Sequence, residues 1–86
     1  MSDRAQNALL QNLERLHTTP MGIERLRRNL LLSESEEPDV IDWCRDRIAD
    51  PGAVISRRGK NWYVNLDDCI ITVNAHSYTI ITAHRL

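Results

Sequence analysis

Residues 62–86 read WYVNLDDCIITVNAHSYTIITAHRL, and this stretch decides the fold. Apolar and polar side chains alternate along it, and short polar pairs interrupt the alternation. A period of two is typical of strands that have one buried face and one solvated face. The stretch therefore predicts three consecutive short strands that are joined by tight turns.

Upstream of this stretch, residues 53–58 continue the same pattern and predict a fourth strand. We expect strands at about 53–58, 61–66, 69–74 and 77–85. Two-residue turns at Gly59–Lys60, Asp67–Asp68 and Ala75–His76 then pair Arg57 with Trp62, Leu66 with Cys69, and Asn74 with Ser77.

This register assigns each side chain to one of two faces, because successive side chains of a strand point in opposite directions. The face expected to lie under the helices carries Ile55, Arg57, Trp62, Val64, Leu66, Cys69, Ile71, Val73, Tyr78, Ile80, Thr82 and His84. The face expected to stay open carries Val54, Ser56, Arg58, Tyr63, Asn65, Ile70, Thr72, Asn74, Ser77, Thr79, Ile81 and Arg85.

The residues before the sheet have helical periodicity, with apolar side chains three or four positions apart. They predict helices at about 3–17, 20–31 and 38–49, the second of them starting at a Thr19 N-cap that Pro20 follows. The expected fold class is α+β, with about three N-terminal helices packed on one face of a four-stranded antiparallel meander sheet. We expect a single domain over residues 1–86.

Composition narrows the classes of function. The 86 residues carry a net charge of −1, so a site for a polyanion has to be local. The sequence has no apolar run long enough to span a bilayer and no signal-peptide core, which predicts a cytoplasmic protein without a membrane partner.

The sequence predicts neither a metal site nor a cofactor. His17, His76, His84, Cys44 and Cys69 lack the spacing of metal-ligand pairs, and the cysteines are interpreted as reduced and buried. A glycine-rich phosphate loop and a nucleophile elbow are both missing from the sequence.

The open face suggests chemistry on RNA. Cleavage by attack of the 2′-hydroxyl needs an acid, a base and cations that stabilise the phosphate. An imidazole titrates near neutral pH, so His76 at the last turn is the candidate acid or base. Arg58 and Arg85 are candidates to clamp the phosphate. Further contacts to RNA are expected from Tyr63, Lys60, Thr72, Asn74 and Thr79.

The same residues also have an interpretation without any catalytic role, in which His76 is a polar turn residue and the arginines are solvated. For His84 we expect a structural role under the helices, and for His17 a capping role at the end of the first helix.

Three motifs carry a resemblance along the chain: residues 16–19 (LHTT), 59–63 (GKNWY) and 71–84 (ITVNAHSYTIITAH). On these motifs the chain resembles a family of small bacterial proteins that form a domain of unknown function. The segment from Ala75 to Tyr78 also gives a weaker similarity to the metal-independent ribonucleases of the barnase, colicin and RelE-like group. That similarity implies helices on one face of an antiparallel sheet, an acid role for His76 and a phosphate-stabilising role for Arg58. The general-base glutamate of that group has no counterpart on a strand here.

Two functions are therefore considered. The first is a small metal-independent endoribonuclease or toxin-like RNA-binding protein that uses the open polar face. The second is a non-enzymatic module that binds a protein partner or forms a homodimer through this face and the sheet edges.

Overall fold

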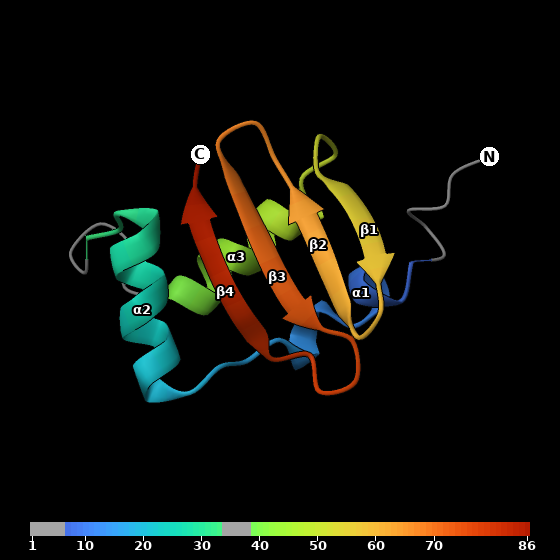
Figure 1. Ribbon diagram of the computed structural model, residues 1–86, viewed down its shortest axis with the longest axis horizontal. Coiled ribbons are helices and arrows are strands. Elements are labelled where there is room, and N and C mark those ends of the chain that lie inside the picture. The colour runs from blue at the N-terminus through green and yellow to red at the C-terminus, as the bar shows by residue number, and fades with distance from the viewer. Residues whose placement is uncertain (1–6, 34–38) are drawn as a thin grey trace.

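The sheet is a meander whose strands neighbour each other in chain order, and it appears in Figure 1 as four antiparallel arrows. The computed structural model describes residues 7–33 and 39–86. Within these residues the strands are β1 (Val54–Arg58), β2 (Asn61–Asn65), β3 (Cys69–Asn74) and β4 (Ile80–Arg85). The helices are α1 (Ala8–Gln11), the 3₁₀ helix η2 (Leu13–Arg15), α2 (Pro20–Leu30) and α3 (Val40–Ala49). The predicted α+β class with a four-stranded antiparallel sheet is confirmed.

The first helical segment is shorter than the helix predicted over 3–17, of which residues 3–6 lie outside the described part of the chain. Asn7 caps α1, because its Oδ1 accepts hydrogen bonds from the backbone N–H groups of Leu9 (2.9 Å) and Leu10 (3.2 Å). Asn12 ends α1, since its backbone leaves the helical region and its side-chain amide donates to the Ala8 carbonyl (2.8 Å). Asparagine competes for backbone hydrogen bonds in this way, and the prediction of one continuous helix is therefore wrong.

Caps define the other two helices. The Thr19 hydroxyl accepts from the Gly22 N–H (3.0 Å) ahead of Pro20, which confirms the predicted start of α2. This helix ends at Leu31, whose φ of 58° lies in the left-handed region. Asp39 caps α3 by accepting from the Asp42 N–H (3.0 Å). Residues 34–38, which include the predicted start of the third helix, lie outside the described residues.

The first two predicted turns are confirmed. Arg57 is paired with Trp62, and the Leu66 N–H donates to the Cys69 carbonyl (2.9 Å) across the turn at Asp67–Asp68. Gly59 has a φ of 56°, which the missing side chain permits in a two-residue hairpin turn.

The third turn is longer than predicted. Asn74 does not pair with Ser77; instead its carbonyl accepts from the Tyr78 N–H (2.9 Å), and its own N–H donates to the Thr79 carbonyl (2.9 Å). Val73 is then paired with Ile80 while Thr72 is paired with Thr82, so β4 holds one extra residue, Ile81, as a β-bulge.

The bulge reverses the faces of the last strand relative to the prediction. A displacement by an odd number of residues exchanges the two faces of a strand. Thr82 and His84 therefore lie on the open face, in register with Thr72 and Ile70, and Arg85 lies on the other face, in register with Cys69. Their predicted faces are wrong, whereas Ile80 before the bulge is buried as expected.

The core joins the buried face of the sheet to α2 and α3. Figure 1 shows α2 beside β4, with which it is in contact, and α3 crossing behind the strands. The side chains that share this core cluster include Leu26, Leu30, Cys44, Ile48, Val64, Cys69, Ile71, Val73, Ile80 and Ala83. Burial and the neighbouring Cys69 raise the pKa of the Cys44 thiol to about 12, so Cys44 stays protonated at neutral pH.

Candidate functional site

The opposite face of the sheet carries polar side chains in three cross-strand rows. One row is Arg58, Asn61 and Asn74; the next is Ser56, Tyr63, Thr72 and Thr82; the third is Val54, Asn65, Ile70 and His84. Tyr63 is half-buried and Thr72 is buried, whereas Ser56 and Arg58 are exposed. The face therefore has a phenol ring near its centre and hydroxyl groups beside it.

Two turns meet at one end of this sheet, which we call the turn end. It consists of Gly59–Lys60, between β1 and β2, and residues 75–79, between β3 and β4. The Ala75 N–H donates to the Lys60 carbonyl (2.8 Å) and ties the two turns together. The exposed side chains of His76 and Lys60 therefore belong to the same end of the sheet.

Asn74 builds the longer of these turns. Its Oδ1 accepts from the N–H groups of His76 and Ser77 (2.9 Å each) and from the Ser77 hydroxyl (3.2 Å). Tyr78 has a φ of 60°, which is rare for a residue with a large side chain and costs roughly 1–2 kcal/mol. Such strain is found at functional sites when the surrounding structure holds it in place.

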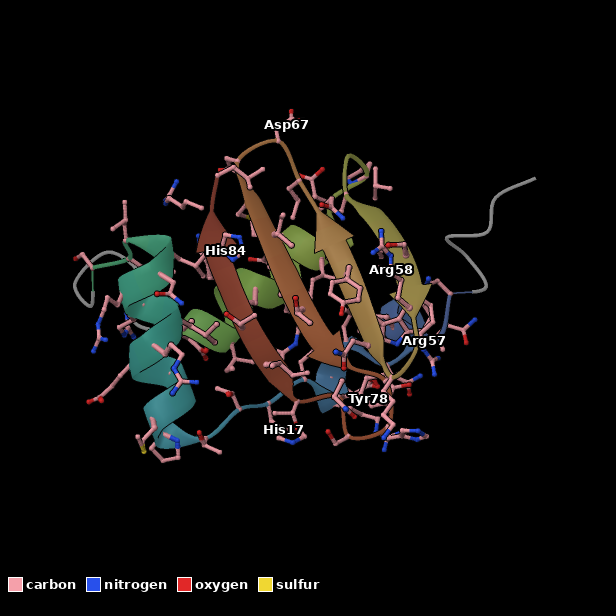
Figure 2. The ribbon with its side chains drawn as sticks, viewed as in Figure 1. His17, Arg57, Arg58, Asp67, Tyr78 and His84 are labelled. Carbon is pink, nitrogen blue, oxygen red and sulfur yellow. The ribbon has the colours of Figure 1, made fainter. Side chains whose placement is uncertain are left out.

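The N-terminal segment adds a second imidazole to the turn end. His17 and Thr79 form a parallel bridge, in which the His17 N–H donates to the Tyr78 carbonyl (3.3 Å) and the Ile80 N–H donates to the His17 carbonyl (2.8 Å). Figure 2 shows His17 and Tyr78 together at this end, away from Asp67 at the other. Sequence reasoning gave His17 a capping role, and its Nδ1 does bond to the carbonyl of Arg15, the last residue of η2 (2.9 Å). Its contact with Thr79 carried no sequence signal.

Guanidinium groups lie against aromatic rings around the turn end. Arg58 lies over Tyr63 (6.0 Å from the ring centroid), Arg57 over Trp62 (5.3 Å) and Arg15 over Tyr78 (4.6 Å). Stacking of this kind orients a guanidinium while leaving its edge free to bind an anion. Figure 2 shows Arg57 and Arg58 on β1.

The structure does not bring Arg85 to the turn end. Arg85 is near the other end of β4, where its Nε donates to the Leu30 carbonyl (2.5 Å) and its Nη1 is 3.9 Å from Asp68 Oδ2. Of the predicted site residues, His76, Arg58, Lys60, Asn74 and Thr79 gather at or beside the turn end, Tyr63 and Thr72 lie on the adjoining open face, and Arg85 stands apart.

The end of the sheet opposite the turn end is acidic. A pocket of about 330 Å³ is lined there by Arg47, Asp50, Gly52, Leu66, Asp67 and Asp68. Arg47 and Asp68 form an ion pair in it. Over residues 7–33 and 39–86, no three histidine, cysteine or acidic side chains group as ligands for a metal ion. The carboxylates of Asp50, Asp67 and Asp68 disfavour binding of a polyanion at this end.

These features define a small α+β domain with a polar sheet face and two imidazole groups at one end of it. The chain belongs to a family described as a protein of unknown function (DUF3781), whose model matches residues 10–84. This agrees with the resemblance to a domain of unknown function and brings no support for the similarity to ribonucleases. No curated protein and no solved structure matches the chain. None of the helices in the described part of the chain is long and apolar enough to cross a membrane.

Proposed function

We propose that this chain is a small endoribonuclease that needs no metal ion, binds RNA along the open sheet face and cuts it at the turn end. The observation that carries the proposal is the backbone bond between the Ala75 N–H and the Lys60 carbonyl (2.8 Å), because it joins the turn that carries the exposed His76 to the turn that carries the exposed Lys60. Transfer of a proton to the leaving 5′-oxygen and stabilisation of the charged phosphate are the two tasks that this chemistry sets.

In this proposal His76 is the acid and Lys60 and Arg58 bind the phosphate. Tyr63 provides a half-exposed ring for stacking a base, in the register position next to Arg58 and Asn61. The near-neutral net charge is compatible with this role, since Lys60 and Arg58 supply positive charge at the turn end while the carboxylates of Asp67 and Asp68 lie at the opposite end. The role proposed for such a nuclease is that of a toxin or phage-related effector.

The test is cleavage of total RNA, and of a short labelled single strand, with and without EDTA. We expect cleavage that persists in EDTA and is lost in His76→Ala while the circular dichroism spectrum stays native. His84→Ala is the matched control, because His84 is also an exposed histidine but lies in the row farthest from the turn end. Wild-type protein that is folded and cuts no RNA would overturn the proposal.

A second candidate function is supported by the free edge of the sheet. Within the described residues, β1 has a strand neighbour on one side only, and Val54 on this edge is 66% exposed. Such an edge can pair with the same edge of a second copy. The second candidate is therefore a non-enzymatic interaction module that forms a homodimer along β1. Light scattering tests it: a dimer that Val54→Lys dissociates supports it, and a monomer at all concentrations contradicts it.

A further inference from the structure

The imidazole of His17 is held with one defined nitrogen toward the turn. Its Nδ1 is 2.9 Å from the Arg15 carbonyl, and a carbonyl oxygen only accepts, so Nδ1 carries the hydrogen. In the neutral ring Nε2 then has a lone pair and accepts a hydrogen bond. The Thr79 hydroxyl is 3.1 Å from this atom and can donate to it. An imidazole fixed in this tautomer has the arrangement that a general base needs.

The hydroxyl groups beside His17 have two consistent arrangements. In the first, Ser77 donates to Thr79 (2.7 Å) and Thr79 donates to His17 Nε2. In the second, Thr79 donates to Ser77 and Ser77 donates to Asn74 Oδ1 (3.2 Å). The second arrangement leaves Nε2 without a donor while both hydroxyl groups stay paired. A hydroxyl from outside the protein can therefore take the place of Thr79 at Nε2 without leaving a polar group unsatisfied.

We propose that His17 is the general base of the cleavage reaction and accepts the proton of the attacking 2′-hydroxyl of RNA. This inference rests on the proposed ribonuclease function, for which the sequence offers no base on a strand. The exposed His17 lies at the same turn as His76, since Thr79 is bonded to His17 and Ser77 adjoins His76. The substrate is RNA and not DNA, because the hydroxyl that loses its proton is absent from DNA.

In the cleavage step one proton passes from the RNA to His17 and another passes from His76 to the RNA. The 2′-oxygen gives its proton to His17 Nε2 and forms a bond to phosphorus, while the bond from phosphorus to the 5′-oxygen breaks. The leaving 5′-oxygen takes a proton from the His76 imidazolium. The products are a 2′,3′-cyclic phosphate and a 5′-hydroxyl, with His17 protonated and His76 neutral at the end of the step.

The test is the dependence of kcat/KM on pH in wild type, His17→Gln and His76→Gln. Glutamine keeps a hydrogen-bonding side chain but does not titrate, and the backbone bridge between His17 and Thr79 does not depend on the side chain. We expect a bell-shaped profile in wild type. His17→Gln should lose the rising limb at low pH and fall in rate by roughly 10²- to 10⁴-fold, and His76→Gln should lose the falling limb at high pH.

Binding and product analysis separate the two proposals. His17→Gln should still bind an uncleavable 2′-O-methyl RNA as wild type does, and the wild-type products should carry a cyclic phosphate. If wild type cleaves RNA and His17→Gln keeps the wild-type rate and profile, the role of His17 is refuted while the ribonuclease stands. If wild type cleaves no RNA, both proposals fall together.

Discussion

Removal of the Asn74 side chain tests how the turn end is held together. The Oδ1 of Asn74 accepts three hydrogen bonds, two from the backbone N–H groups of His76 and Ser77 and one from the Ser77 hydroxyl. A net hydrogen bond contributes about 0.5–1.5 kcal/mol. The donors belong to exposed residues and regain bonds to water in Asn74→Ala, so each loss falls at the low end of that range. We expect the free energy of unfolding to drop by about 1–2 kcal/mol.

Thermal unfolding followed by circular dichroism measures this loss. For a domain of this size about 1 kcal/mol corresponds to roughly 4–8 °C, so the Tm of Asn74→Ala should fall by roughly 4–16 °C. Asn74→Asp is the matched control, because it keeps an acceptor oxygen at the same position and should stay within about 0.5 kcal/mol of wild type. Hydrogen exchange at the amides of His76 and Ser77 should accelerate only in the alanine variant.

Two results would refute this reasoning. An unchanged Tm in Asn74→Ala would mean that the side chain does not hold the turn. Equal losses in Asn74→Ala and Asn74→Asp would mean that the amide group matters for a reason other than its acceptor oxygen.

Three further predictions address the rest of the fold. Arg85→Ala loses the bond to the Leu30 carbonyl and should lower the free energy of unfolding in urea by about 1–2 kcal/mol, whereas no loss would contradict that contact. Because folding raises the pKa of Cys44, the contribution of this thiol to the free energy of unfolding is complete below about pH 9 and is lost as the pH rises toward 12, at up to about 1.4 kcal/mol per pH unit. Cys44→Ala should flatten this dependence on pH in urea titrations. The bulge leaves Ile81 exposed and buries Ala83, so Ile81→Ser should change the free energy of unfolding by less than about 0.5 kcal/mol and Ala83→Leu should lower it by about 1–3 kcal/mol. A larger loss in Ile81→Ser than in Ala83→Leu would contradict the bulge.

The alternation of the sequence was sufficient to predict most of the sheet. The pairings around Gly59–Lys60 and Asp67–Asp68 follow from two-residue turns between antiparallel strands, and the structure confirms both. Side-chain capping also predicted the start of α2, because a threonine before a proline satisfies the first turn of a helix.

The last turn and strand were predicted wrongly for a local reason. The left-handed conformation of Tyr78 is unusual for an aromatic residue, so the sequence favours a shorter turn there. The adjacent pair Ile80 and Ile81 fits the alternation with either residue buried, and in the structure Ile80 is buried and Ile81 forms the bulge. Asparagine at positions 7 and 12 was the signal for a short first helix, since both residues favour caps over helix interiors.

Only part of the candidate site could be predicted from the sequence, because one of its contacts is tertiary. His76, Lys60 and Arg58 are close in space because of the hairpins, which are local and follow from the strand pattern. His17 reaches Thr79 through a tertiary contact, and no periodicity along the chain encodes it.

The pairing of His17 with Thr79 also has a consequence for folding. The two residues are 62 positions apart in the chain, and the length-dependent part of the entropy cost of closing such a loop is about 3.7 kcal/mol. We expect a contact of such high sequence separation to form after the hairpins, whose partners are neighbours in the chain. A nascent or partly unfolded chain therefore has its β1–β2 hairpin before it has the imidazole beside the hydroxyl. The contact between His17 and Thr79 is then present only once the N-terminal segment has joined the sheet.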